Sequence, residues 1–286
     1  MRINTNINSM RTQEYMRQNQ DKMNTSMNRL SSGKRINSAA DDAAGLAIAT
    51  RMRAKENGLG VASRNTQDGI SLIRTADSAL NSVSNILLRM RDLAVQSANG
   101  TNSTDDRTAI DKEFGQLINQ IDYIAKNTAF NGTTLLNGAE VSGKHEKTSS
   151  IAIKTYDDGG AADISITLAS ANAVDLGLAK AGAKADDPIV PANVTDADII
   201  TTIDTKLKDI TTSRADLGAT LNRLDFNVAN LNSQASSMAS SASQIEDADM
   251  AKEMSEMTKF KILNEAGISM LSQANQTPQM VSKLLQ

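Results

Sequence analysis

Apolar residues recur at alternating intervals of three and four positions over residues 200–245. This spacing is the a/d pattern of a coiled-coil helix, whose apolar stripe must be covered by another helix. At about 1.5 Å per residue, an unbroken helix here would extend roughly 68 Å. The pattern therefore predicts a rod, and not a helix that wraps round a globular core. The positions of the stripe are Ile200, Ile203, Leu207, Ile210, Arg214, Leu217, Leu221, Leu224, Val228, Leu231, Ala235, Met238, Ala242 and Ile245.

A second long helix is predicted from about Asp41 to residues 98–100. Its main stripe also alternates threes and fours, and a parallel stripe at intervals of seven widens the apolar face. A face of this width indicates that the helix meets more than one neighbour. The main stripe is Ile73, Ala76, Leu80, Val83, Leu87, Met90 and Ala94, and the parallel stripe is Leu72, Ala79, Ile86 and Leu93.

A third helix is predicted between two local signals. Ser103 and Asp106 have the spacing of a capping box, and Asn131-Gly132 is a turn dipeptide. The link at residues 101–105 is short, so this helix must fold back antiparallel on the second one. With the helix at residues 200–245, it completes a three-helix rod. The expected rod core includes Leu80, Val83, Leu87, Phe114, Leu117, Ile121, Leu224, Val228 and Leu231.

The middle of the chain, residues 133–194, follows another pattern. Large apolar residues occupy alternate positions at residues 151–153 and 164–168, and Asp-Asp-Gly-Gly lies between them at residues 157–160. Alternation on both sides of a turn sequence predicts one or two β-hairpins. Thr and Asp at residues 195–198 then have the spacing of a cap for the long helix. We interpret this polar, Gly- and Ala-rich segment as a surface-exposed elaboration and not a second core.

The two ends of the chain are polar and carry opposite charge. Residues 1–40 hold seven Lys and Arg against two acidic residues, whereas residues 246–286 hold four against six. Opposite charge favours pairing of the ends, although a single exposed ion pair contributes little. Neither end has enough apolar surface to offset its own ordering entropy. We therefore expect both ends to be disordered in an isolated monomer and to become ordered by packing.

Composition supports long packed helices over a compact enzyme fold. Aromatic residues are 2% of the 286 residues, and there is no Trp or Cys. The absence of Cys excludes disulfides, thiolate metal sites and Cys nucleophiles. A net charge of -3 gives no basic field for nucleic acid, and no apolar window is long enough to span a membrane. Residues 1–20 lack the apolar region of a cleaved signal peptide, which alone suggests a cytoplasmic protein without excluding export by another route.

No group of residues predicts catalysis, a cofactor or a metal. His145 is the only histidine, and the following Glu146 does not complete the zinc motif, which needs a second histidine. We interpret His145 as a solvated loop residue. The paired acids at residues 41–42 suit the positive end of a helix, and those at residues 157–158 suit a hairpin turn. We therefore expect no enzyme activity.

Seven motifs in both halves of the chain resemble those of bacterial flagellin, the subunit of the flagellar filament. The similarity covers roughly residues 1–138 and 214–286. The motifs are LSSGKRINSAADDAAGLAI at residues 30–48, NTQDGISLI at 65–73, LAVQSANG at 93–100, FNG at 130–132, DLGA at 216–219, IEDAD at 245–249 and QANQTPQ at 273–279.

The resemblance implies a mainly α fold, in which the N- and C-terminal parts form a long coiled-coil-like rod with a small β-hairpin region in the middle. Residues 1–40 and 246–286 would form an inner layer of paired termini. Residues 41–132 and 195–245 would form the three-helix rod, and residues 133–194 the variable exposed region. The inner-layer assembly residues would be Ile3, Ile7, Met23, Met27, Leu30, Met254, Met257, Leu263, Leu271, Val281, Leu284 and Leu285.

The resemblance also implies a function and partners. The chain would be exported unfolded through the flagellar type III apparatus, with an export chaperone on its C-terminal segment. It would polymerise outside the cell, beneath a filament cap and next to hook-associated proteins, for swimming motility. Family members are recognised by Toll-like receptor 5, and the matching residues here are Arg89, Leu93 and Glu113. One departure is Ser282, which stands where the family has an apolar residue.

Two alternatives to a filament subunit remain at this stage. The first is a binding module, either a flagellin-like junction protein between hook and filament or a coiled-coil adaptor. Copy number on isolated filaments would distinguish it. The second is an enzyme carried on a flagellin-like chain, against which the missing second histidine and the short middle segment argue.

Overall fold

The computed structural model describes residues 6–141, 144–146, 148–156, 164–178 and 199–284. The chain divides into two compact units. The first contains Met1–Asn57 and Ala235–Gln286, and the second contains Gly58–Gln234. Helices α2 and α4 each contribute residues to both units. We describe each unit separately.

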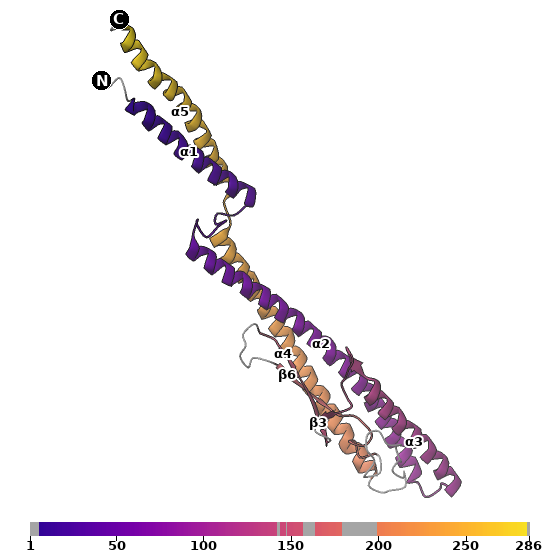
Figure 1. The fold of residues 1–286 in the computed structure, drawn as a ribbon. Coiled ribbons are helices and arrows are strands. Elements are labelled where there is room, and N and C mark those ends of the chain that lie inside the picture. The colour runs from indigo at the N-terminus through magenta and orange to yellow at the C-terminus, as the bar shows by residue number, and fades with distance from the viewer. Residues whose placement is uncertain (1–5, 142–143, 147, 157–163, 179–198, 285–286) are drawn as a thin grey trace. The chain divides into compact units, whose positions relative to one another are not determined.

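The described residues confirm the mainly α fold class (Figure 1). The strands form three two-stranded antiparallel pairs, β1 with β2, β3 with β4, and β5 with β6. The helices are α1 (Ile7–Ser32), α2 (Ala43–Ser97), α3 (Thr104–Asn127), α4 (Ile199–Glu246) and α5 (Met250–Leu284). The strands are β1 (Ala129–Phe130), β2 (Thr133–Thr134), β3 (Ala139–Val141), β4 (Lys144–Glu146), β5 (Thr148–Ile153) and β6 (Ile164–Ala169).

The second unit has a continuous apolar core between α2, α3 and α4. On α4, every seventh residue from Ile203 to Leu231 is buried, whereas the intervening stripe positions such as Leu207 and Val228 are half-buried. One heptad position of α4 therefore points into the core and the other flanks it. The buried apolar residues of α2 in this unit are Leu59, Ala62, Ile70, Leu72, Ile73, Ala76, Leu80, Val83, Leu87, Met90, Leu93 and Ala94.

Helix α3 packs with a slightly different face from the one that the sequence suggested. Phe114 and Ile121 are fully buried. Ile118, which was not among the predicted core residues, is also fully buried. Leu117 is half-buried at the edge of the core. The buried positions of α3 are thus spaced by four residues from Ile110 to Phe114 and from Phe114 to Ile118, and by three from Ile118 to Ile121. Ile118 therefore packs in the core in place of the expected Leu117.

Local capping interactions fix where α2 and α3 begin. Asp42 accepts hydrogen bonds at Oδ1 from the backbone N–H of Ala44 (3.1 Å) and of Gly45 (2.9 Å), so α2 begins at Ala43. The capping box of α3 is confirmed, with Asp106 N–H donating to Ser103 Oγ at 3.2 Å. The Ser103 hydroxyl also holds the pKa of Asp106 below its ordinary value by donating to the carboxylate.

The hairpin predicted around residues 151–168 is confirmed as the pair of β5 and β6, with Ile151 opposite Ile166. Ile153, Ile166 and Leu168 are buried against the helices of the second unit. At Gly69 of α2 an added Cβ would lie 2.0 Å from Ile153 Cδ1, so the missing side chain lets the hairpin approach the helix. The turn at residues 157–160 and the cap at residues 195–198 lie outside the described residues.

Two further strand pairs were not distinguished from the sequence. Strands β1 and β2 meet at Asn131 (φ 48°) and Gly132 (φ 81°), which are the left-handed conformations that a two-residue hairpin turn favours. Strands β3 and β4 place His145 opposite Glu140. The expectation of a loop at His145 is therefore wrong. The strand was not predicted because the run Lys-His-Glu has no apolar alternation that would mark it as a strand.

Candidate assembly surface

Helices α1 and α5 of the first unit lie side by side and run antiparallel (Figure 1). They approach closely at Gly267, where an added Cβ would lie 2.8 Å from Met16 Cγ. Polar contacts bridge the pair from one end to the other. They join Asn6 Nδ2 to the carbonyl oxygen of Ala274 (2.9 Å), Asn264 Nδ2 to Gln20 Oε1 (2.6 Å), and Arg29 Nη1 to Glu253 Oε1 (3.3 Å).

This helix pair contains no buried apolar side chain among those that the structure describes. The buried residues are Ser26 on α1 and Glu253 on α5. Large apolar side chains of both helices are instead exposed, by 41% at Leu263 and by 68% at Met270. The exposed set is Ile7, Met10, Tyr15, Met27, Met250, Met254, Ile262, Leu263, Ile268 and Met270. The pair is thus an amphipathic surface without a dry core of its own.

The residues expected in an inner layer fall into three groups on this pair. Four are exposed, namely Ile7, Met27, Met254 and Leu263. Four are half-buried, namely Met23, Leu30, Met257 and Leu271. For Val281 and Leu284 the structure describes the α5 backbone only, and Ile3 and Leu285 lie outside the described residues.

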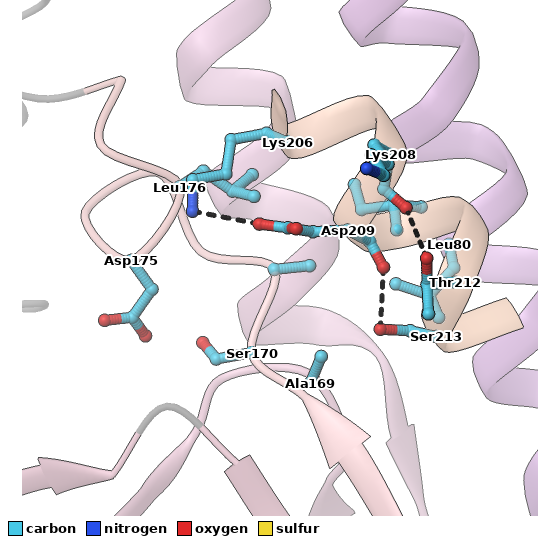
Figure 2. A pocket seen from close by; sticks show the side chains of 12 residues that line it. Leu80, Ala169, Ser170, Asp175, Leu176, Lys206, Lys208, Asp209, Thr212 and Ser213 are labelled. Atoms are coloured by element: carbon cyan, nitrogen blue, oxygen red, sulfur yellow. Dashed lines mark hydrogen bonds and ion pairs between the residues drawn. The ribbon is translucent and has the colours of Figure 1, made fainter. Parts of the chain in front are cut away.

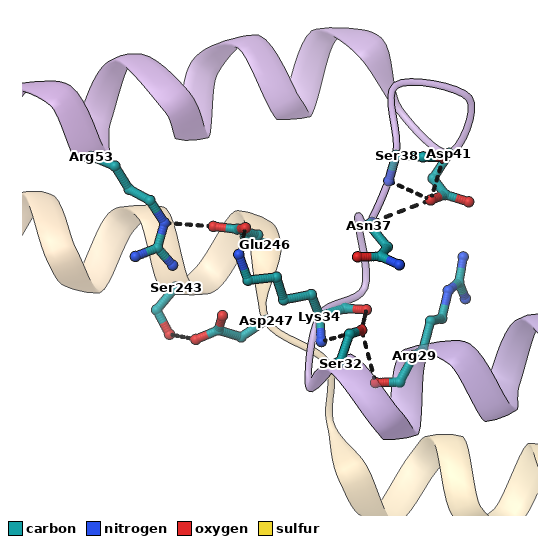
Figure 3. Close-up of polar contacts among 10 residues, drawn as sticks. All are labelled: Arg29, Ser32, Lys34, Asn37, Ser38, Asp41, Arg53, Ser243, Glu246 and Asp247. Carbon is teal, nitrogen blue, oxygen red and sulfur yellow. Dashed lines mark hydrogen bonds and ion pairs between the residues drawn. The ribbon is translucent and has the colours of Figure 1, made fainter.

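Beside the helix pair, two chain segments are held together by their backbones (Figure 3). We call residues 33–36 and 246–249 the joint. Arg35 N–H donates to the Glu246 carbonyl oxygen at 2.7 Å, and Ala248 N–H donates to the Gly33 carbonyl oxygen at 2.9 Å. Gly33 ends α1 with φ 71°, a conformation that costs glycine little. The joint therefore ties the end of α1 to the segment between α4 and α5.

The side chain of Glu246 is the charged centre of the joint. It is buried, and it pairs with Lys34 and with Arg53, whose Nε lies 2.7 Å from Glu246 Oε2. The hydrogen bond from Lys34, followed by that from Arg53, lowers the pKa of Glu246 from its ordinary value of 4.5. Sequence reasoning noted the motif at residues 245–249 but not these partners, which are distant along the chain.

The three residues assigned to receptor recognition lie on α2 and α3 of the second unit. Arg89 Nη2 and Glu113 Oε1 form an exposed ion pair at 2.7 Å. Leu93, one turn further along α2, is only 1% exposed and belongs to the core of the unit. A partner that approached this face would therefore meet the two charged side chains and not the buried side chain of Leu93.

A pocket of about 380 Å³ lies between α4 and the segment that follows β6 (Figure 2). Lys206 and Asp209 project from α4 into it, and Lys206 Nζ lies 3.2 Å from Asp209 Oδ2. These two charges neutralise each other. Across the described residues, no group of three or more His, Cys, Asp or Glu side chains is arranged to hold a metal ion. The described helices also include none that is long and apolar enough to cross a membrane.

Comparisons with known proteins agree with the helical architecture. The model for the bacterial flagellin N-terminal helical region matches residues 3–140, and that for the C-terminal helical region matches residues 200–285. A flagellin from Listeria monocytogenes is 48% identical over 100% of this chain and 99% of its own length. A flagellin from Bacillus subtilis is 39% identical over the whole of both chains.

Among solved structures, Bacillus cereus flagellin is 41% identical and matches 63% of this chain and 94% of its own, with a TM-score of 0.45. The family models together cover more than half of the chain, and the relatives extend over its full length. The chain therefore belongs to the bacterial flagellin family, whose members are structural subunits of the flagellar filament and not enzymes.

Proposed function

We propose that this filament subunit polymerises by ordering α1 and α5 against the terminal helices of neighbouring copies. The observation that supports this proposal is the helix pair without buried apolar side chains in its described part. Polar bridges alone do not offset the entropy of ordering two long helices. Apolar surface supplied by other copies does, and assembly is then coupled folding and binding.

The proposal also assigns roles to the domains expected from the sequence. Residues 1–40 and 246–286 form the inner layer, residues 41–132 and 195–245 the rod, and residues 133–194 the variable region, whose buried side chains such as Ile166 pack on the core of the second unit. The second unit supports a preformed rod, since Leu80, Phe114 and their neighbours already form a closed core.

The ion pair of α1 and α5 gives the proposal further support. Glu253 is buried, and its Oε2 has no hydrogen-bond partner in the described part of the chain, nor has Arg29 Nε. Unpaired buried polar atoms are costly, so this contact gains free energy if packing against a neighbour closes it into a bidentate pair. Assembly would then add a second hydrogen bond to the ion pair of Arg29 and Glu253, which has one in the single copy.

The ordering of α1 and α5 on assembly also accounts for the proposed export route and partners. Ends that order only on assembly can pass unfolded through the narrow channel of the flagellar type III apparatus. The exposed methionines of α5, including Met254 and Met270, suit an export chaperone, because methionine side chains adapt to several partners. Outside the cell, the same ends become ordered beneath the filament cap, next to hook-associated proteins.

The test is elongation of filament seeds by truncated monomers. Chains that lack residues 1–30 or 250–286 should keep the helical signal of the second unit by circular dichroism and should not elongate seeds. The full-length chain is the control and should elongate them. Truncated chains that still form filaments would refute the proposal.

We also propose that Toll-like receptor 5 recognises the monomer through Arg89 and Glu113. Both side chains are exposed and form an ion pair, whereas Leu93, one turn further along α2, is buried in the core of the unit. In a reporter-cell assay, Arg89→Ala should lower the response strongly, while Arg91→Ala, on the same helix but paired with Asp204, should lower it less. No response to the unaltered monomer would contradict the proposal.

A further inference from the structure

Phe226 on α4 is the most exposed large apolar side chain of the described residues, at 79%. It follows the fully buried Leu224 by two positions, which is about 200° round the helix. Its ring therefore points away from the core of the second unit. The adjacent Asp225 is also exposed and has no ion-pair or hydrogen-bond partner among the described residues. Large exposed aromatic side chains of this kind commonly anchor protein interfaces.

A groove lies elsewhere on the same unit, between α2 and the end of α3. It has a volume of about 640 Å³ and is lined by small side chains such as Ser78, Ala79 and Ser82, with Ile124 as its bulkier apolar residue. Thr128 Oγ1 donates to the Ile124 carbonyl oxygen, so this hydroxyl is already satisfied. Arg74 is the charged residue of the groove, and it is exposed without a partner in the described part of the chain.

The side chain of Phe226 and the groove cannot meet within one copy. Arg214 Nε lies 2.7 Å from Asp77 Oδ1, which marks the level of α4 beside the groove. Phe226 lies 12 residues further along α4, or roughly 18 Å. It also faces away from the core that α4 shares with α2 and α3. Two copies are therefore needed to bring Phe226 and the groove together.

We propose that Phe226 of one copy inserts into the α2–α3 groove of a second copy, where Asp225 pairs with Arg74. The inference rests on the proposed polymerisation and names a contact between rods within it. A knob and a groove at different places on one chain form a head-to-tail contact, and such contacts generate an open helical polymer when the rotation between copies does not close a ring. Each such contact displaces the next copy by roughly 18 Å along α4.

The chemistry of the contact favours this pairing. The Phe226 ring is a planar apolar group that small side chains can surround, and a guanidinium can lie over its face while binding the neighbouring carboxylate. The described residues include no hydrogen-bond or ion-pair partner for Arg74 or Asp225, so their pairing breaks no contact described within one copy.

The first experiment measures seed elongation by charge-reversed monomers. Arg74→Glu and Asp225→Arg should each raise the critical concentration at least about tenfold, because each places like charges together in the contact. The double variant, and an equimolar mixture of the two single variants, should elongate almost as well as the unaltered chain. Tyr156→Ala, which truncates an exposed aromatic residue outside the groove, should have no effect.

The second experiment uses the absence of cysteine from the chain. In assembled filaments of a Phe226→Cys, Ala79→Cys variant, mild oxidation should produce a ladder of covalently linked subunits on non-reducing gels. The two positions are too far apart within one copy to form a disulfide. The matched variant Phe226→Cys, Tyr156→Cys should give no ladder.

The outcomes separate this inference from the proposed function. The unaltered chain could elongate seeds while the charge-reversed variants elongate them equally well, or while the double variant fails to recover elongation. Either outcome would overturn the Phe226 contact and leave the proposed polymerisation intact. Absence of the cysteine ladder would also overturn the contact. If the unaltered chain does not elongate seeds, both the proposed function and the contact that depends on it fail.

Discussion

The two helix assemblies of this chain differ in where their apolar side chains lie. In the second unit, the stripes of α2, α3 and α4 close on one another, and Phe114, Ile121 and Leu224 are fully buried. In the pair of α1 and α5, the described apolar side chains are exposed or half-buried. Both assemblies are long antiparallel helices, so helix formation alone does not distinguish them. The position of the apolar side chains separates the helices with a closed core from the pair that, in the proposed assembly, packs against other copies.

The largest expected effect comes from the closed core. Phe114→Ala should destabilise the monomer by about 3–5 kcal/mol, because it removes a buried ring and leaves a cavity. Urea unfolding followed by circular dichroism measures this change. The matched change on the terminal pair, Leu263→Ala, should alter monomer stability by less than about 0.5 kcal/mol. Equal losses of unfolding free energy in the two variants would contradict the difference between the closed core and the terminal helix pair.

An intermediate effect is expected at the joint. Glu246→Gln should weaken the assembled state by about 1–3 kcal/mol per subunit, because it removes charge-assisted hydrogen bonds with Lys34 and Arg53. The critical concentration for seed elongation measures the loss. Asp249→Asn, which alters a neighbouring acid outside the ion cluster, is the control. A Glu246→Gln chain that elongates normally would show that the joint needs only its backbone bonds.

The pH dependence of this effect has a definite sign. The pKa of Glu246 is lowered in the folded state by Lys34 and Arg53, so its contribution is fully present above the ordinary value of 4.5. As the pH falls below that value and through the lowered pKa, the carboxylate is protonated and the contribution is lost. The difference between the unaltered chain and Glu246→Gln should therefore narrow between neutral pH and strongly acidic pH. A difference that stays constant would contradict the role of the charge.

The smallest effect on stability is expected at the exposed pair of Arg89 and Glu113. A double-mutant cycle with alanine at both positions should give a coupling of about 0.2–1 kcal/mol, as is usual for exposed ion pairs. Urea unfolding of the four monomers supplies the numbers. A much larger coupling would mean that the pair stabilises the rod, and a loss of receptor response could then no longer be assigned to recognition alone.

The sequence predicted those parts of the fold that depend on neighbours along the chain. Heptad spacing located α4, the spacing of Ser103 and Asp106 located the start of α3, and apolar alternation located the hairpin of β5 and β6. It could not decide which of two adjacent positions, Leu117 or Ile118, faces the core, because both fit a helical stripe. That choice depends on how three helices are rotated against each other.

The candidate site was less accessible to sequence reasoning. The amphipathic ends were visible as polar segments with methionines at helical spacing. The partners of Glu246 were not, since Lys34 and Arg53 are separated from it by most of the chain. The burial of Leu93 agrees with its place in the widened stripe of α2 and not with a receptor contact through an exposed side chain. Long-range pairing and burial follow from packing, which periodicity constrains only in part.

The hydrogen bond between Asn6 and Ala274 has a practical consequence. It brings positions near the two ends of the sequence to within bonding distance, at the same place on the helix pair. A bulky group attached at either Asn6 or Ala274 would therefore occupy the same place on the helix pair. Labels are better attached to the solvent-facing side of the second unit, for example by a single cysteine in place of Tyr156, whose side chain is exposed.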